Sequence, residues 1–126
     1  MTQSTTRAKS AVLATNEAFY AAFRDGDYPA MDALWSTEHQ VTVGHPGWHH
    51  ITGRDEVMES WYRILRLGRP PKVKAVDPNV IVNGRSAMVT CIEDVGEVRL
   101  VATNTFVQEA KGWKLIGHQA QHLPDA

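Results

Sequence analysis

The residues 43–61 hold the densest group of side chains in this chain that can do chemistry. His45 follows a short alternating segment and precedes Pro46, and Trp48 lies in the same predicted loop. Histidine titrates near neutral pH, so His45 is a candidate general acid or base, or a hydrogen-bond donor to a ligand. The alternative is a structural histidine whose ring is bonded to the backbone. These residue types predict a pocket more firmly than they predict a reaction.

Two polar residues of the C-terminal half fall on an otherwise apolar strand face. If Gly96-Glu97 is a two-residue turn, counting back along both strands places Glu93 and Asn104 on the same side. A polar side chain on an apolar face needs a partner. Asn104 therefore either bonds a neighbouring side chain or lines a ligand cavity. Glu93 lies nearer the turn and is expected to be a solvated carboxylate at the rim of that cavity.

The predicted first helix and the tryptophans supply the other candidates for contact with a ligand. Asn16 lies within an apolar helical stripe and leaves the same two alternatives as Asn104. Tryptophans more often pack in a core than hold a ligand, and Trp48 has the strongest claim because it lies in a loop. With His45 and Asn104 as candidate catalytic residues, the residues expected to contact a ligand are Asn16, Phe19, Tyr20, Trp48, Trp61, Glu93 and Phe106.

The 6 histidines of the chain raise the question of a metal site, and their spacing argues against one. On a strand, His118 and His122 are roughly 13 Å apart at about 3.3 Å per residue, which is too far for one ion. The loop histidines have no cluster of carboxylates or thiolates nearby. The chain also lacks a glycine-rich phosphate loop, a nucleophile elbow and a Cys-His pair. We therefore expect no metal and no cofactor.

Composition and charge limit the classes of partner. A chain of 126 residues with 43% hydrophobic residues is typical of one globular domain, which we expect over residues 8–126 after a disordered segment at 1–7. The net charge of -1 and the scattered basic residues argue against nucleic acid. No apolar run approaches the roughly 20 residues that span a bilayer. Cys91 is the only cysteine, and residues 1–11 lack the apolar core of a signal peptide, so we expect a cytoplasmic protein that does not bind membranes.

The hydrophobic pattern predicts helices first and an antiparallel meander after them. The helices are expected over about 8–25, from Asp27-Pro29 to about 35, and from Thr52 or Gly53 to Gly68. The strands are expected over 41–43, 73–82, 86–95, 98–108 and 113–121. Asn83-Gly84 is a hairpin signal, and Pro78 indicates an edge strand or a bulge. This order predicts an α+β fold in which about three N-terminal helices pack on a curved, mostly antiparallel sheet and enclose a cone-shaped interior.

Three passages resemble the nuclear transport factor 2-like (NTF2-like) superfamily, and its SnoaL-like branch in particular. They are the run from His45-Pro46-Gly47 to Gly53-Arg54, the run Thr103-Asn104-Thr105-Phe106, and the run from Trp113 to Ala120. The resemblance covers about residues 8–122. It implies the cone-shaped fold and a homodimer formed through the open sheet face. That face would carry Ile92, Val101, Thr103, Thr105 and Val107, a set too apolar and β-branched to stay exposed to water.

Ketosteroid isomerase is the sharpest comparison within this superfamily. Its general base is an aspartate followed by proline, and His45-Pro46 stands at that place. Its oxyanion hole is formed by a tyrosine and a protonated aspartate, and the matching positions hold Phe19 and Asn104. Tyr20 is adjacent to Phe19 but is expected to point elsewhere, because successive helical residues are about 100° apart. The resemblance thus argues against steroid isomerisation and leaves room for other proton-transfer chemistry.

Two functions follow as expectations. In the first, an apolar pocket binds a small, mostly neutral organic molecule, with isomerase- or hydrolase-like proton transfer through His45 and with Asn104 polarising a carbonyl. In the second, the cone is a filled core, and the chain is a non-catalytic module for dimerisation or ligand sensing. The residue types fit both, because one histidine and one amide on apolar walls serve a binding site as well as an active site.

Overall fold

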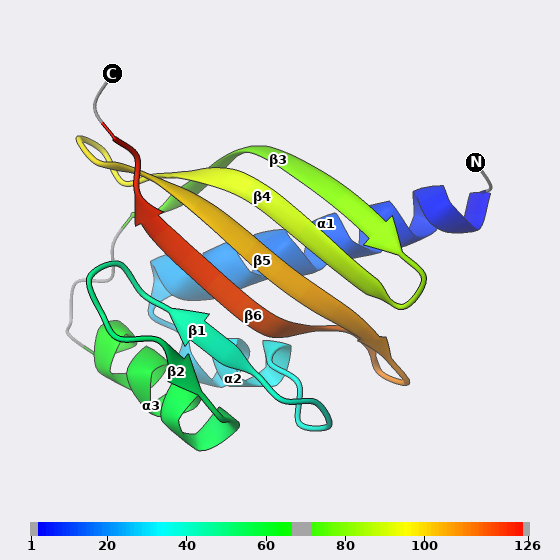
Figure 1. Cartoon of the computed structure of the whole chain (residues 1–126), viewed down its shortest axis with the longest axis horizontal. Helices are drawn as coiled ribbons and strands as arrows, with labels where there is room; N and C mark the ends of the chain where they lie inside the picture. The colour runs from blue at the N-terminus through cyan, green and yellow to red at the C-terminus, as the bar shows by residue number, and fades with distance from the viewer. Residues whose placement is uncertain (1–2, 67–71, 125–126) are drawn as a thin grey trace.

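A computed structural model of the protein describes residues 3–66 and 72–124 (Figure 1). Within them the elements are α1 (Gln3–Asp25), α2 (Tyr28–Leu34), β1 (Thr42–Gly44), β2 (Ile51–Thr52), α3 (Arg54–Leu65), β3 (Lys74–Asn83), β4 (Ser86–Asp94), β5 (Arg99–Glu109) and β6 (Gly112–His122). The strands form one sheet in the order β2-β1-β6-β5-β4-β3, antiparallel except where β1 pairs with β6. The helices lie behind and below this sheet, and none of those described lies on its front face (Figure 1). The predicted α+β cone fold is confirmed.

The helix boundaries follow from local sequence signals. Asp27 caps α2 by accepting a hydrogen bond from the amide of Ala30 at 3.1 Å, and α3 begins directly after Gly53, as predicted. The predicted start of the first helix was late, because α1 already begins at Gln3. The polar segment expected to be disordered is therefore helical over residues 3–7, and residues 1–2 lie outside the described residues. None of the described helices is both long enough and apolar enough to cross a membrane.

The register of the β4–β5 hairpin agrees with the one counted from the sequence. Glu93 pairs with Leu100 and Val89 pairs with Asn104, around a turn closed by the hydrogen bond from the Val95 amide to the Val98 carbonyl. The β3–β4 turn is shifted by one residue from the prediction. Asn83 pairs with Ser86 there, so that residues 84–85 form the turn, and Gly84 takes the positive φ of 59°.

Two bulges bend the sheet. β3 is an edge strand with a register shift between Val76 and Asn79, which confirms the reading of Pro78 as an edge or bulge residue. A second shift lies in β6, where Leu115 pairs with Phe106 but Gly117 pairs with Thr105. One extra residue, Ile116, is thereby inserted into β6, and the strand's alternation changes parity beyond it.

The core fills the space between α1, α3 and the inner sheet face. Its largest fully buried side chains are aromatic, and Phe19 contacts Trp61 edge to face with ring centroids 5.4 Å apart. Cys91 is also buried on the inner face, where the strand alternation predicted it. Arg54 at the start of α3 ties this helix to α2, donating hydrogen bonds to Asp32 and to the carbonyls of Ser36 and Trp35. These contacts fix the position of α3, which carries Ser60 and Trp61 of the site described next.

Candidate functional site

Asn104 lies at the centre of a buried polar network. Its Oδ1 accepts a hydrogen bond from His118 Nδ1 at 2.6 Å, and its Nδ2 donates to Asn16 Oδ1 at 2.8 Å and to the Tyr20 hydroxyl at 3.1 Å. Asn104 is completely buried. Of the two alternatives, bonding to neighbouring side chains is the one observed for Asn104. Asn16 is likewise buried and serves as one of those neighbours.

Tyr20 connects this network to Glu93. The Tyr20 hydroxyl donates to Glu93 Oε2 at 2.7 Å and lies 3.3 Å from Cys91 Sγ. Two predictions are wrong here. Tyr20 does not point away from the interior, because the buried stripe of α1 is wide enough to hold both Phe19 and Tyr20 without exposure. Glu93 is not a solvated rim carboxylate, since only 4% of it is exposed.

Burial sets the protonation of the Tyr20–Glu93 pair. Desolvation raises the pKa of the Glu93 carboxyl above its ordinary value, and the hydrogen bond from Tyr20 opposes this rise. Desolvation and the neighbouring Glu93 raise the pKa of Tyr20, so the phenol keeps its proton at neutral pH. Both shifts favour the protonated forms, and a protonated Glu93 would be able to donate a hydrogen bond to a ligand.

His45 follows the last residue of β1 and turns into the interior. Its Nε2 lies 2.9 Å from Ser60 Oγ on α3, and its ring contacts Trp61 and Trp48 edge to face, with centroids 4.7 and 4.9 Å away. His45 is 5% exposed, and burial lowers its pKa to about 4. The imidazole is therefore uncharged at neutral pH, and an uncharged imidazole can accept a proton.

His118 is a site residue that the sequence analysis missed. It lies in β6 beyond the bulge, is buried, and places its ring centroid 6.2 Å from that of His45. Its Nε2 is 3.9 Å from Glu93 Oε2. Burial, followed by the neighbouring His45, lowers the pKa of His118 to about 3. Because Nδ1 donates its proton to Asn104, the Nε2 of neutral His118 carries a lone pair.

A cavity of about 350 Å³ joins three of these groups. His45, Glu93 and His118 border it among apolar side chains that include Phe23, Trp48 and Leu100. Of the predicted site residues, the cavity therefore brings together His45, Trp48 and Glu93. The expectation that Asn104 borders the same cavity as His45 is not met: His118, the cross-strand partner of Asn104, lines the cavity, and Asn104 does not. The remaining predicted residues that do not border it are Asn16, Phe19, Tyr20, Trp61 and Phe106.

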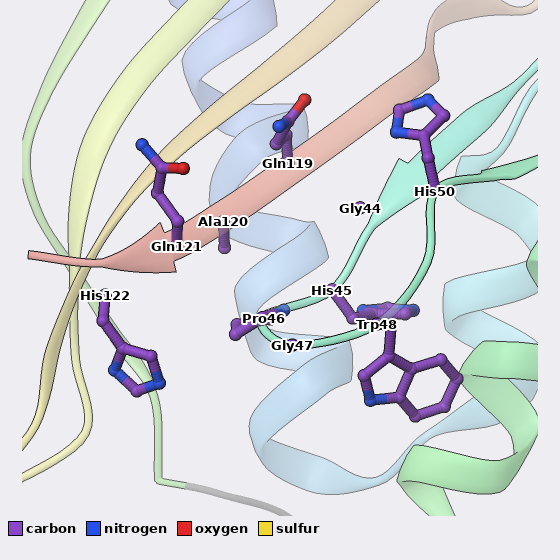
Figure 2. A pocket seen from close by; sticks show the side chains of 10 residues that line it. All are labelled: Gly44, His45, Pro46, Gly47, Trp48, His50, Gln119, Ala120, Gln121 and His122. Carbon is purple, nitrogen blue, oxygen red and sulfur yellow. The ribbon is translucent and has the colours of Figure 1, made fainter.

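A second, polar hollow of about 280 Å³ lies on the other side of the loop at residues 45–48. Figure 2 shows Gln119 and Gln121 projecting from β6 on the side opposite to His122. No Lys, Arg, Asp or Glu is among the described residues that line this hollow. It shares His45, Pro46, Trp48 and His122 with the apolar cavity, so the loop separates two spaces of different polarity. Across the described residues, no cluster of three or more His, Cys, Asp or Glu side chains is placed to hold a metal ion.

The two buried histidines predict a loss of stability in mild acid. Their folded pKa values of about 4 and about 3 lie below the ordinary histidine value of 6.5, so the unfolded chain binds more protons at intermediate pH. The free energy of unfolding should therefore fall as pH drops from 6.5 toward 4, by up to about 1.4 kcal/mol per pH unit and histidine. Glu93, whose pKa is raised, opposes this trend above pH 4.5. Urea titrations at several pH values measure the slope, and it should be shallower in His45→Gln; an equal slope would contradict the burial of an uncharged His45.

Comparisons with known proteins agree with this architecture. Residues 12–122 match the model of the SnoaL-like domain family. A proposed dehydratase of the NTF2-like family from Streptomyces avermitilis is 31% identical, with a TM-score of 0.87 over 98% of this chain and 100% of that one. A proposed association domain of a calcium/calmodulin-dependent protein kinase type II from Thiobacillus denitrificans is 30% identical, with a TM-score of 0.70 over 88% and 94%.

More distant structures show the same fold alone. A proposed ketosteroid isomerase from Parabacteroides distasonis is 17% identical and has a TM-score of 0.73 over 89% of this chain and 85% of that one. A comparison with curated proteins finds no significant match. The family model covers residues 12–122, and the 31% identical NTF2-like structure from Streptomyces avermitilis covers 98% of this chain. The chain therefore belongs to the SnoaL-like domain family within the NTF2-like superfamily.

Proposed function

We propose that the protein is an enzyme that binds a small, mostly neutral organic molecule in the apolar cavity and moves a proton on it. The observation that carries the proposal is the convergence of His45, Glu93 and His118 on one cavity of about 350 Å³. Ligand sites of this kind are mostly apolar, with a few placed polar groups. Desolvation lowers the pKa of both histidines and raises that of Glu93, so burial disfavours charge on all three groups and a neutral ligand fits the site best.

The roles follow from the contacts of each group. His45 is the general base, because its imidazole is uncharged at neutral pH and borders the cavity. Glu93, held by Tyr20, is the hydrogen-bond or proton donor to a carbonyl or hydroxyl of the ligand. Asn104 takes a supporting role in place of the catalytic one expected from the sequence: it fixes the ring of His118 through a 2.6 Å hydrogen bond.

The reaction class supported best is proton abstraction next to a carbonyl, followed by isomerisation or by loss of water. In isomerisation, the carbon-bound proton taken by His45 returns at another carbon. In loss of water, a carbon–carbon double bond forms, the carbon–oxygen bond breaks, and the leaving hydroxyl takes the Glu93 proton. The proposed dehydratase at 31% identity favours the second outcome. Both begin with the same step at His45.

Deuterium exchange tests this first step without knowledge of the natural substrate. Small cyclic ketones and β-hydroxyketones are incubated with the protein in D₂O, and deuterium at the carbon next to the carbonyl is followed by NMR. Exchange faster than in buffer, saturable in ketone and lost in His45→Gln, supports the proposal. Saturable binding of these ketones without any exchange favours the non-catalytic alternative, a ligand-sensing module.

A homodimer through the open sheet face is the second proposal. The face carrying Ile92, Val101, Thr103, Thr105 and Val107 is only partly buried in the single chain, and none of the described helices covers it (Figure 1). The association domain at 30% identity supports assembly of this chain with itself. An apolar, β-branched sheet face that stays exposed would be an aggregation hazard, and pairing with a second copy removes it.

Val101→Glu should therefore dissociate the dimer. The substitution places a charge at the middle of the apolar face, where burial against a second copy would leave it unpaired at a cost of several kcal/mol. Sedimentation at micromolar concentration measures the change from dimer to monomer. Lys111→Glu, at an exposed turn residue, is the matched control and should sediment like the wild type. A wild-type monomer, or an unaltered dimer in Val101→Glu, contradicts this interface.

A further inference from the structure

The hydroxyl of Ser60 has two buried contacts, and only one of them can use its single proton. Ser60 Oγ lies 2.6 Å from the Val57 carbonyl oxygen and 2.9 Å from His45 Nε2. A carbonyl oxygen only accepts hydrogen bonds, so the serine proton is directed to Val57. The contact with His45 must then be donated by the imidazole, which places a proton on Nε2. Ser60 is 3% exposed and thus shielded from water, which could otherwise replace either partner.

The position of that proton decides which nitrogen of His45 is free to react. A neutral imidazole carries one N–H, so Nδ1 must hold the lone pair. No hydrogen bond to Nδ1 is found among residues 3–66 and 72–124, and the neighbouring Trp48 and Trp61 rings meet the imidazole edge to face. We propose that Ser60 is a positioning residue that holds His45 as the Nε2–H tautomer and so makes Nδ1 the proton-accepting atom.

The neighbouring His118 does not fix the tautomer of His45. Its ring centroid lies 6.2 Å from that of His45, and its Nδ1 proton is donated to Asn104. The structure therefore assigns opposite tautomers to the two buried histidines: Nε2–H for His45 and Nδ1–H for His118. The inference rests on the proposed function only in naming Nδ1 as the reacting atom, since the tautomers themselves are properties of the free protein.

Long-range ¹H–¹⁵N correlation spectra of the ¹⁵N-labelled full-length protein near neutral pH test the tautomers directly. In the wild type, His45 Nε2 should show the shift of a protonated nitrogen and Nδ1 that of a lone-pair nitrogen. His118 should show the reverse pattern and serves as an internal reference. A wild-type His45 protonated on Nδ1, or an even mixture of both forms, overturns the proposal.

Two substitutions identify Ser60 as the cause. In Ser60→Ala, the two His45 nitrogen shifts should move toward each other and the slowly exchanging Nε2 proton should be lost, while the His118 shifts stay unchanged. Ser60→Thr keeps the hydroxyl and should keep the wild-type His45 pattern. If Ser60→Ala leaves the His45 shifts as they are, the tautomer is a preference of the ring itself and the assignment to Ser60 fails.

Ketone exchange then separates this proposal from the proposed function. With His45 acting through Nδ1, Ser60→Ala should lower kcat for deuterium exchange and leave KM nearly unchanged, because the hydroxyl does not touch the ligand. If the tautomers are as assigned but no ketone exchanges, the proposed function fails and the role of Ser60 in orienting His45 stands. If exchange is observed and Ser60→Ala changes neither the shifts nor kcat, the proposed function stands and the role of Ser60 fails.

Discussion

His45→Gln is expected to slow deuterium exchange into a bound ketone by roughly 10²- to 10⁴-fold, the contribution that a positioned general base typically makes. Glutamine cannot accept a proton at neutral pH, but its amide N–H can take the place of Nε2–H at Ser60 Oγ. The fold should thus stay intact, with a melting temperature close to that of the wild type. Solvent exchange measured by NMR and thermal unfolding measured by circular dichroism give the two readouts.

His49→Gln is the matched control for this loss. His49 lies in the same loop, is exposed, and is not among the described residues that border either the cavity or the polar hollow. Exchange in this variant should remain at the wild-type rate. If His45→Gln instead lowers the melting temperature strongly while exchange by the folded fraction continues, His45 is a structural histidine and the base lies elsewhere.

Asn104→Leu is expected to destabilise the protein by about 3 kcal/mol or more, since each buried polar group left without a partner costs about 1–3 kcal/mol. The variant leaves the Nδ1 proton of His118 without its acceptor and removes the hydrogen bonds to Asn16 and Tyr20. Leucine has a similar size, so the lost hydrogen bonds rather than a cavity cause the effect. Urea denaturation measures it as a lower midpoint with an unchanged slope.

Gln119→Leu makes the same chemical change at an exposed position of β6 and should alter the free energy of unfolding by less than about 0.5 kcal/mol. The double variant Asn16→Leu/Asn104→Leu should lose less than the sum of the two single variants, because both remove the same 2.8 Å hydrogen bond. An Asn104→Leu protein that is as stable as the wild type but no longer exchanges deuterium would return Asn104 to the catalytic role predicted from the sequence.

Much of the fold could be predicted because its determinants are local. Asp27 signals a helix start through a cap, and residues 96–97 signal a two-residue turn, and both signals operate over only a few residues. Once the turn was fixed, strand alternation placed Glu93, Cys91 and Asn104 on the inner face. Alternation says which way a side chain points. It does not say how deep the side chain lies, and so the burial of Glu93 was not foreseen.

The sequence by itself determined the fold class, the family resemblance and the presence of His45 at the end of a short strand. The tertiary structure alone decided which groups meet it. His118 reaches the cavity because the extra residue at Ile116 reverses the alternation of β6; an unbroken count from the buried Leu115 would have turned Gly117 inward and His118 outward. Bulges depend on how neighbouring strands pair across the sheet. No residue pattern within β6 predicts this bulge. His118, the partner of His45 in the cavity, could therefore be identified only in the folded chain.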